Sequence, residues 1–138
     1  MNANKILAKT LYGEGRNQGE RGMRAIATVI YNRAKGQRER FAGVCLKPKQ
    51  FSCWNGVDNI IVSSAPADKQ AYEICCAIVK EMMDDTFIPV DKKEKITFTH
   101  YCTVKLFNST KCAEWIKQVK ESGQPTVIIG DHIFMEAN

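Results

Sequence analysis

The sequence predicts one α+β domain, mainly helical, with a small antiparallel sheet towards its C-terminal end. Apolar residues recur at helical spacing in several segments, one segment near residue 100 alternates as strands do, and two short β-branched runs flank a Gly-Asp turn. The 138 residues suit one domain of ordinary size with a real core. We therefore expect residues 1–138 to form a single domain.

The N-terminal part predicts two helices. Ala3–Gly13 has its apolar residues at three-and-four spacing, and the glycines at its end are expected to stop it. Gln18–Lys35 has the same spacing over a longer stretch. We expect Asn17 to cap this second helix, Glu20 to complete a capping box, and Gly36 to end it.

The middle of the chain contains an irregular stretch followed by a helix. Periodicity fails over Gln37–Pro66, where glycines and prolines alternate with large apolar residues. This pattern favours an ordered loop with short helical turns, and loops of this length in compact domains tend to be functional. Asp68–Asp84 then resumes a strong helical pattern.

The C-terminal part combines strands with one helix. Ile96–Tyr101 alternates and is rich in β-branched and aromatic residues, which indicates a strand. Lys111–Ser122 is typical of a short helix closed by Gly123. Thr126–Met135 predicts a β-hairpin around a tight turn.

Charge and hydropathy narrow the possible partners. Twenty Lys and Arg against fifteen Asp and Glu give a net charge of +5, which favours an anionic partner. No nucleic-acid-binding motif is present, so a nucleic-acid module is only a second class of hypothesis. No apolar run is long enough to cross a bilayer. The N-terminus lacks the apolar stretch of a secretory signal, so we expect synthesis in the cytoplasm without export by this segment.

The six cysteines predict neither a metal site nor a disulfide framework. Their spacing has no zinc-type pair, and we expect no metal and no cofactor. Reduced, mostly buried thiols are the favoured interpretation. A catalytic cysteine with one of the two histidines stays an alternative, because no local motif selects one. The cysteines are Cys45, Cys53, Cys75, Cys76, Cys102 and Cys112.

Glu14 is the first candidate for catalysis. A carboxylate near a helix C-terminus lies at the negative end of the helix dipole, which disfavours its ionised form. A general acid working near neutral pH needs that property. The alternative is a solvated surface acid paired with Arg16.

Four ordered segments resemble the spore-cortex-lytic cell-wall hydrolase family, which has phage-encoded members. The first is Tyr-Gly-Glu-Gly-Arg at 12–16, followed by Gly22 and Ala-Thr-Val-Ile-Tyr-Asn-Arg at 27–33. The second is Gln-Phe-Ser at 50–52, within the stretch 44–54. The third is Thr-His-Tyr at 99–101 with Trp115, and the fourth is Ile-Gly-Asp-His-Ile-Phe at 129–134.

The resemblance implies a lysozyme-like α+β domain that cleaves peptidoglycan between N-acetylmuramic acid and N-acetylglucosamine. Glu14 matches the family's catalytic glutamate. The family commonly has Ala-Arg-Gly-Glu after that glutamate, whereas this chain has Gly-Arg-Asn-Gln at 15–18. An auxiliary acid at position 18 is therefore absent, which bears on rate and substrate range.

The number of carboxylates bears on the mechanism. Retaining and inverting glycosidases normally need a second carboxylate. The candidates are Glu20, Asp58 and Asp131, none of them at a position that the family motifs fix. With one convincing carboxylate, lytic transglycosylation is favoured, in which Glu14 acts as acid and then as base and yields a 1,6-anhydro product. A hydrolytic muramidase, as in an endolysin, and a non-catalytic wall-binding homologue remain alternatives.

The remaining motif residues are predicted to bind the saccharide. Amide and hydroxyl groups suit sugar hydroxyl and acetamido groups, and aromatic rings suit sugar faces. We expect a monomer acting on peptidoglycan glycan strands, released to the wall after synthesis or carried in a virion. The predicted substrate-binding residues are Gln50, Phe51, Ser52, Tyr101, His100 and His132.

Overall fold

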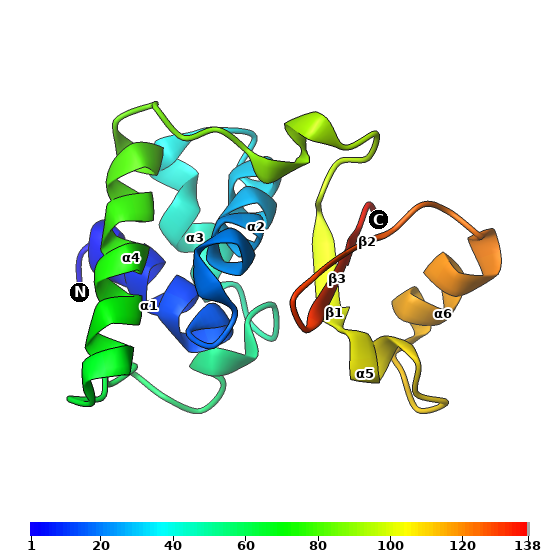
Figure 1. Ribbon diagram of the computed structural model, residues 1–138, viewed down its shortest axis with the longest axis horizontal. Helices are drawn as coiled ribbons and strands as arrows, with labels where there is room; N and C mark the ends of the chain where they lie inside the picture. Colours follow the sequence, from blue (N-terminus) through cyan, green and yellow to red (C-terminus); the bar gives the residue numbers. More distant parts are fainter. Residues whose placement is uncertain (138) are drawn as a thin grey trace.

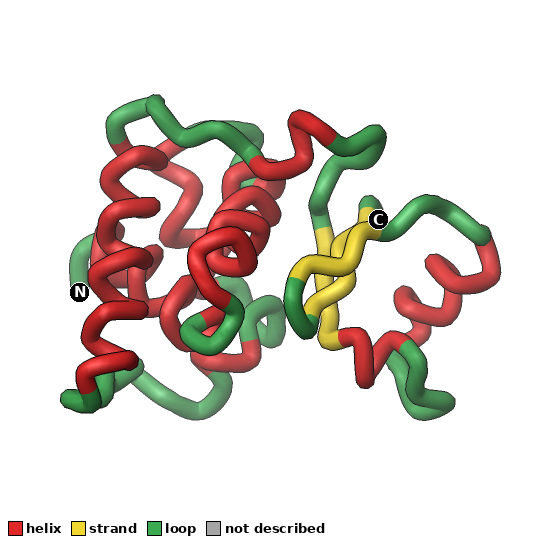
Figure 2. The backbone as a smooth tube through the Cα atoms, viewed as in Figure 1, coloured by secondary structure: helices red, strands yellow, loops and turns green. Residues whose placement is uncertain are grey.

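The computed structural model describes residues 1–137 and has two halves side by side (Figure 1). Helices fill the first half, and the strands gather in the second, as the tube view shows (Figure 2). Two short helices accompany the strands. The helices of the first half are α1 (Ala3–Gly15), α2 (Gly19–Arg33), α3 (Phe41–Leu46) and α4 (Pro66–Met83). Three 3₁₀ turns accompany them: η1 (Arg38–Arg40), η2 (Ser52–Trp54) and η3 (Val90–Lys93).

The second half is built around an antiparallel sheet in the order β1-β3-β2. Tyr101 is paired with Phe134, and Ile129 with His132. The predicted fold class, mainly helical with a small antiparallel sheet, is therefore confirmed. The elements are β1 (His100–Thr103), α5 (Val104–Phe107), α6 (Glu114–Ser122), β2 (Val127–Ile129) and β3 (His132–Met135).

The first strand begins later than its pattern predicts. Residues 96–99 precede β1, because the backbone N–H of Phe98 donates to the Asp91 side chain at 2.9 Å instead of to a neighbouring strand. Asp91 also accepts from the Asn32 side chain at 2.9 Å. An aspartate side chain seven residues earlier in the chain therefore accepts the backbone hydrogen bond of Phe98, and strand periodicity carries no sign of it.

The sheet lies between two apolar cores, and its middle strand β3 is buried on both faces. Phe134 belongs to the core of the helical half, where it stacks on Phe98 at 5.0 Å. Ile133 and Met135 belong to a second core with α6. Because side chains alternate along a strand, His132 and Phe134 face the helices, and Tyr101, paired with Phe134 on β1, faces them too.

Helix α1 continues through both glycines to Gly15, so the expected stop at Gly13 is wrong. Both glycines serve close packing instead. A Cβ on Gly13 would lie 2.7 Å from Cys53 Cβ, and one on Gly15 would lie 2.9 Å from Ile26 Cδ1. The helix therefore places Glu14 in its last turn, against the 50–54 segment.

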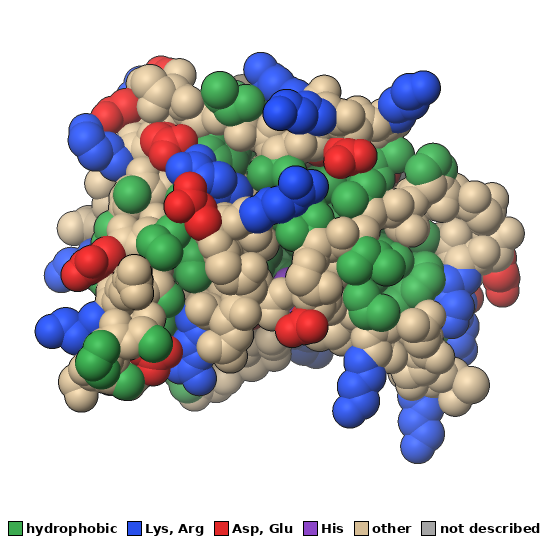
Figure 3. Space-filling model, viewed as in Figure 1, with side chains coloured by type: hydrophobic (Ala, Val, Ile, Leu, Met, Phe, Trp, Pro, Cys, Tyr) green, Lys and Arg blue, Asp and Glu red, His purple; other side chains and the backbone are tan. Residues whose placement is uncertain are grey.

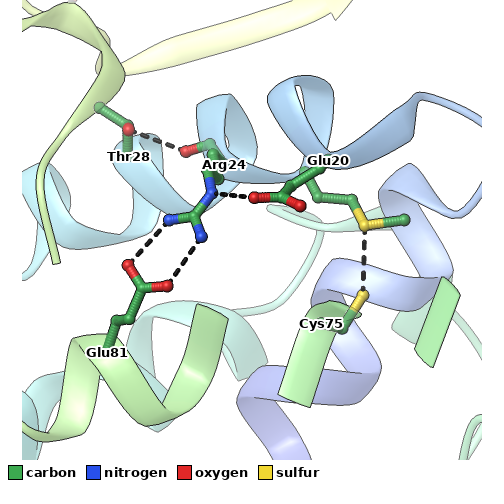
Figure 4. A network of polar contacts seen from close by, with 6 residues as sticks. Glu20, Arg24, Thr28, Cys75 and Glu81 are labelled. Carbon is green, nitrogen blue, oxygen red and sulfur yellow. Dashed lines mark hydrogen bonds and ion pairs between the residues drawn. The ribbon is translucent and has the colours of Figure 1, made fainter. Parts of the chain in front are cut away.

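The expected capping box of the second helix is also wrong. Gln18 is the N-cap residue of α2, and no side chain caps the helix. Glu20 pairs instead with Arg24 at 2.9 Å. Arg24 also holds Glu81 of α4 through two nitrogens, at 2.8 and 2.7 Å, and this ties α2 to α4 (Figure 4).

The stretch 37–66 contains η1, α3 and η2, which confirms an ordered loop with short helical turns. Helix α5 and turn η3 have no counterpart among the predicted elements, since each is a single turn. All six cysteines are free thiols, and only Cys76 among them is exposed. Within residues 1–137, no helix is long and apolar enough to cross a membrane.

Candidate active site

The carboxylate of Glu14 accepts hydrogen bonds from two separate parts of the chain. Its Oε1 accepts from the Tyr101 hydroxyl of β1. Its Oε2 accepts from the backbone N–H of Cys53 at 3.1 Å and, over a longer 3.4 Å contact, from the Ser52 hydroxyl. The partners come from η2 and the sheet, so the orientation of the acid depends on the packing of both halves.

Tyr101 acts as the donor in its contact with Glu14. Burial and the adjacent Glu14 carboxylate hold the pKa of Tyr101 well above its ordinary value of 10.0. The phenol therefore keeps its proton across the physiological range. Three neighbouring rings pack around the Tyr101 ring. The distances between ring centres are 5.4 Å to Phe134, 6.4 Å to Phe51 and 5.0 Å to His132, which makes an edge contact.

Two cavities of about 440 Å³ each meet at Glu14. Gly13, Glu14, Thr103 and His132 line both, so the two cavities form one cleft with the acid at its middle. In the space-filling view a histidine is visible in the hollow between the two halves (Figure 3). The cleft thus lies between α1 and the sheet, where an extended ligand would pass the carboxylate.

The first cavity is lined mainly by polar and aromatic side chains. Arg33 donates from Nε to the Thr99 carbonyl at 2.7 Å and from Nη1 to Gln50 Oε1 at 2.9 Å. Its guanidinium also lies 5.6 Å from the centre of the Phe51 ring. Burial lowers the pKa of Arg33 from 12.5, yet the group stays charged at any physiological pH. Arg33 therefore fixes the Gln50 side chain on the wall of the cleft.

The second cavity is closed at one side by a reciprocal pair. Gln18 Nε2 donates to Asp131 Oδ2 at 3.1 Å, and the Asp131 backbone N–H donates to Gln18 Oε1 at 2.9 Å. The glycines beside it leave room for this side chain: a Cβ on Gly130 would lie 2.5 Å from Gln18 Oε1, and one on Gly22 would lie 2.5 Å from Gln18 Cβ. The pair joins the α1–α2 connection to the β2–β3 turn.

Four of the six predicted substrate-binding residues line the first cavity together with Glu14: Gln50, Ser52, Tyr101 and His132. Phe51 is only 2% exposed and packs beneath the cleft. His100 lines neither cavity; its ring lies 5.2 Å from Trp115, which does line the first one. The substrate-binding roles of all six residues stay predictions.

The candidate second carboxylates are separated from one another. Glu20 is paired with Arg24 on the α2–α4 side. Asp58 is exposed and lines neither cavity. Asp131 lines the second cavity, where its side chain accepts from Gln18. Among residues 1–137, Glu14 is therefore the one carboxylate shared by both cavities.

Sequence patterns did not single out Arg33, Thr103 or Gln18 as part of the cleft. Arg33 closes the 27–33 segment at the end of a helix, and nothing in that segment indicates that it lines a cleft. At Gln18 the sequence indicates only that the glutamate common in the family is absent. Within the described residues, no group of His, Cys, Asp and Glu side chains could hold a metal ion.

Comparison with known proteins places this fold and its cleft in a family. Residues 17–135 match the model of the Cell Wall Hydrolase family, so the chain belongs to that family. Glu14 lies just before the matched residues. No curated protein matches the chain.

Among solved structures, the chain is similar to the catalytic domain of the germination-specific lytic transglycosylase SleB from Bacillus anthracis. The TM-score is 0.62 at 23% sequence identity, and the match covers 99% of this chain and 95% of the other. This likeness establishes a shared fold over the whole length.

Proposed function

We propose that this chain cleaves the peptidoglycan glycan strand between N-acetylmuramic acid and N-acetylglucosamine as a lytic transglycosylase. Family membership supports a cell-wall substrate. The observation that carries the reaction is the single carboxylate at the junction of two cavities, held by Tyr101 and the 52–53 segment.

In the first step Glu14, protonated, gives its proton to the glycosidic oxygen. The bond from that oxygen to C1 of the muramic sugar breaks, and the N-acetylglucosamine portion leaves with the proton. The muramic ring carries the resulting positive charge as an oxocarbenium ion, which its own acetamido oxygen stabilises.

In the second step the Glu14 carboxylate accepts the proton of the muramic C6 hydroxyl. The C6 oxygen attacks C1 and closes a 1,6-anhydro ring, which returns Glu14 to its protonated form. One residue thus serves as acid and then as base. A mechanism with one carboxylate agrees with a cleft in which the two cavities share Glu14.

A hydrolytic muramidase reaction on the same bond is the alternative, with water attacking C1 in place of the C6 hydroxyl. Asp131 is the nearest candidate for a second carboxylate because it lines the second cavity. Its oxygen is already engaged by Gln18, which favours the transglycosylase reaction.

Digestion of purified sacculi, followed by mass spectrometry of the released muropeptides, tests this proposal. Transglycosylation yields anhydro-muropeptides, each lighter by one water molecule than the hydrolytic product. Reducing muramic ends would contradict it in favour of the muramidase. Binding to sacculi without any release would support the non-catalytic alternative.

A further inference from the structure

His132 is a buried histidine that lacks a hydrogen-bond partner at the middle of the cleft. The residue is 7% exposed, and its Nδ1 is enclosed with no partner within the described residues. A buried polar group without a partner destabilises the folded protein. Nδ1 is the ring nitrogen that is enclosed in this way, so Nε2 is the one that a ligand can reach.

The position of the ring connects it to the reacting bond. His132 starts β3 on the face towards the helices, and it lines both cavities together with Glu14. Its ring lies edge-on to Tyr101 at 5.0 Å, and Tyr101 in turn donates to Glu14. A sugar next to the carboxylate therefore also lies next to this imidazole.

The ring is neutral near neutral pH. Burial lowers the pKa of His132 from its ordinary 6.5, although Glu14 and Asp131 act in the opposite direction. A neutral imidazole carries one proton, on Nδ1 or on Nε2. Enclosed N–H groups without an acceptor are rarer than enclosed unpaired acceptors, so the enclosed Nδ1 places the proton on Nε2.

We propose that His132 donates a hydrogen bond from Nε2 to an oxygen of the glycan strand at the scissile linkage. The inference rests on the proposed function, because it names the contact made with that substrate. Several glycan oxygens can accept such a hydrogen bond, and the acetamido carbonyl and the ring hydroxyls are those that distinguish one sugar from another. His132 is then a specificity residue that recognises an N-acetyl sugar or its hydroxyl pattern beside the acid.

Three substitutions separate this role from a structural one. His132→Gln can place an amide N–H near the position of Nε2, His132→Asn places it near Nδ1, and His132→Phe keeps a ring without either nitrogen. We expect His132→Gln to keep kcat/KM on soluble glycan oligomers within about threefold. The Asn and Phe variants should each lose about tenfold, the size of one lost hydrogen bond.

Melting temperature provides the readout that distinguishes the two roles. His132→Phe should melt at the same temperature or higher, because it removes an unpaired polar group from a buried site. Loss of activity in a fully stable Phe variant supports the proposal. A Phe variant as active as the parent, or losses that follow the melting temperature across all three variants, would overturn it.

A binding measurement keeps this test independent of turnover. Affinity for purified glycan strands is compared between Glu14→Gln and the double variants that add His132→Phe or His132→Gln. The Phe double variant should bind about tenfold more weakly and the Gln double variant should bind normally. Equal affinity of all three overturns the proposal, even if the parent cleaves nothing.

De-N-acetylated glycan then identifies the acceptor oxygen. If the Phe penalty disappears on this glycan, the acceptor is the acetamido carbonyl. If the penalty is unchanged, the acceptor is another oxygen of the glycan, such as a hydroxyl.

Discussion

The hydroxyl of Tyr101 donates a hydrogen bond to Oε1 of Glu14 across 87 residues of sequence. One partner lies in the last turn of α1 and the other on β1. The contact therefore joins the helical half to the sheet half at the point where the two cavities meet. Any relative movement of the halves would change the orientation of the carboxylate.

Tyr101→Phe should lower the cleavage rate with little change in stability. The phenylalanine ring keeps the packing against Phe134 and His132, while the donor to Glu14 is lost. A hydrogen bond to a charged group is worth about 1.5–3 kcal/mol, so we expect a decrease of about ten- to a hundredfold in the rate of sacculus clearing. An unchanged rate in the folded variant would show that Tyr101 does not position the acid.

Arg33→Lys should weaken substrate binding more than turnover. The lysine keeps the charge but cannot donate to both the Thr99 carbonyl and Gln50, because it lacks the planar fork of the guanidinium. We expect KM on soluble glycan oligomers to rise about three- to tenfold, with kcat within about twofold.

Gln50→Leu is the matched comparison for Arg33→Lys. It leaves the arginine in place and removes the amide that the arginine holds on the wall of the cleft. The same rise in KM is expected from both variants. If Gln50→Leu leaves KM unchanged, Gln50 does not contact the glycan and its predicted role is wrong.

Gln18→Glu should destabilise the protein, although the family commonly has glutamate there. The new carboxylate would lie against the Asp131 carboxylate, at an oxygen that now accepts from Gln18 over 3.1 Å. We expect a loss of about 1 kcal/mol in the free energy of unfolding, because a hydrogen bond is replaced by like-charge repulsion at a partly exposed site.

The double variant Gln18→Glu with Asp131→Asn checks the cause of that loss. Its asparagine amide can donate to the new glutamate, which restores the contact with the donor and acceptor exchanged. Urea unfolding should show most of the stability recovered. A double variant as unstable as Gln18→Glu alone would point to some cause other than the facing charges.

The stability of the fold should decrease as the pH falls from 7 to 5. Burial, and then the nearby Arg33, lower the pKa of His100 from 6.5 to about 4 in the folded protein. Between pH 7 and pH 5 the His100 side chain therefore binds a proton in the unfolded chain but not in the folded one. The free energy of unfolding decreases as the pH is lowered. His132, whose pKa burial also lowers, contributes in the same direction.

His100→Gln isolates the His100 share of this dependence. The side chain is partly exposed, so we expect the variant to remove about 1 kcal/mol of the difference between pH 7 and pH 5 in urea unfolding. Glu81, held by Arg24, has a pKa below its ordinary 4.5, so its effect lies below this window. A variant with the full parental pH dependence would contradict the burial of a neutral His100.

The sequence predicts the long elements well because their signals are local. Apolar periodicity locates α1, α2 and α4, and the Gly-Asp turn locates the β2–β3 hairpin. The sequence misplaces the end of α1. Gly13 and Gly15 suggest a helix stop, but glycine is present there because Cys53 and Ile26 approach the helix too closely for a Cβ. It also misplaces the start of β1, because the backbone N–H of Phe98 donates to the Asp91 side chain, which lies outside the sheet.

The candidate site was predictable as a set of residues and unpredictable as an arrangement. Motif order selects Glu14 and several residues that line the cleft beside it. The Gln18–Asp131 pair and the support of Gln50 by Arg33 both join distant segments. Such contacts depend on tertiary packing, which periodicity and motif spacing do not encode.

The central claim is that Glu14 is the acid and base of peptidoglycan cleavage, and Glu14→Gln tests it most directly. The amide cannot donate the proton to the glycosidic oxygen, so the variant should fold, melt close to the parent and bind sacculi. It should release no anhydro-muropeptides by mass spectrometry under conditions in which the parent releases them readily. Release of anhydro-muropeptides by a folded Glu14→Gln variant at a rate near that of the parent would contradict the account.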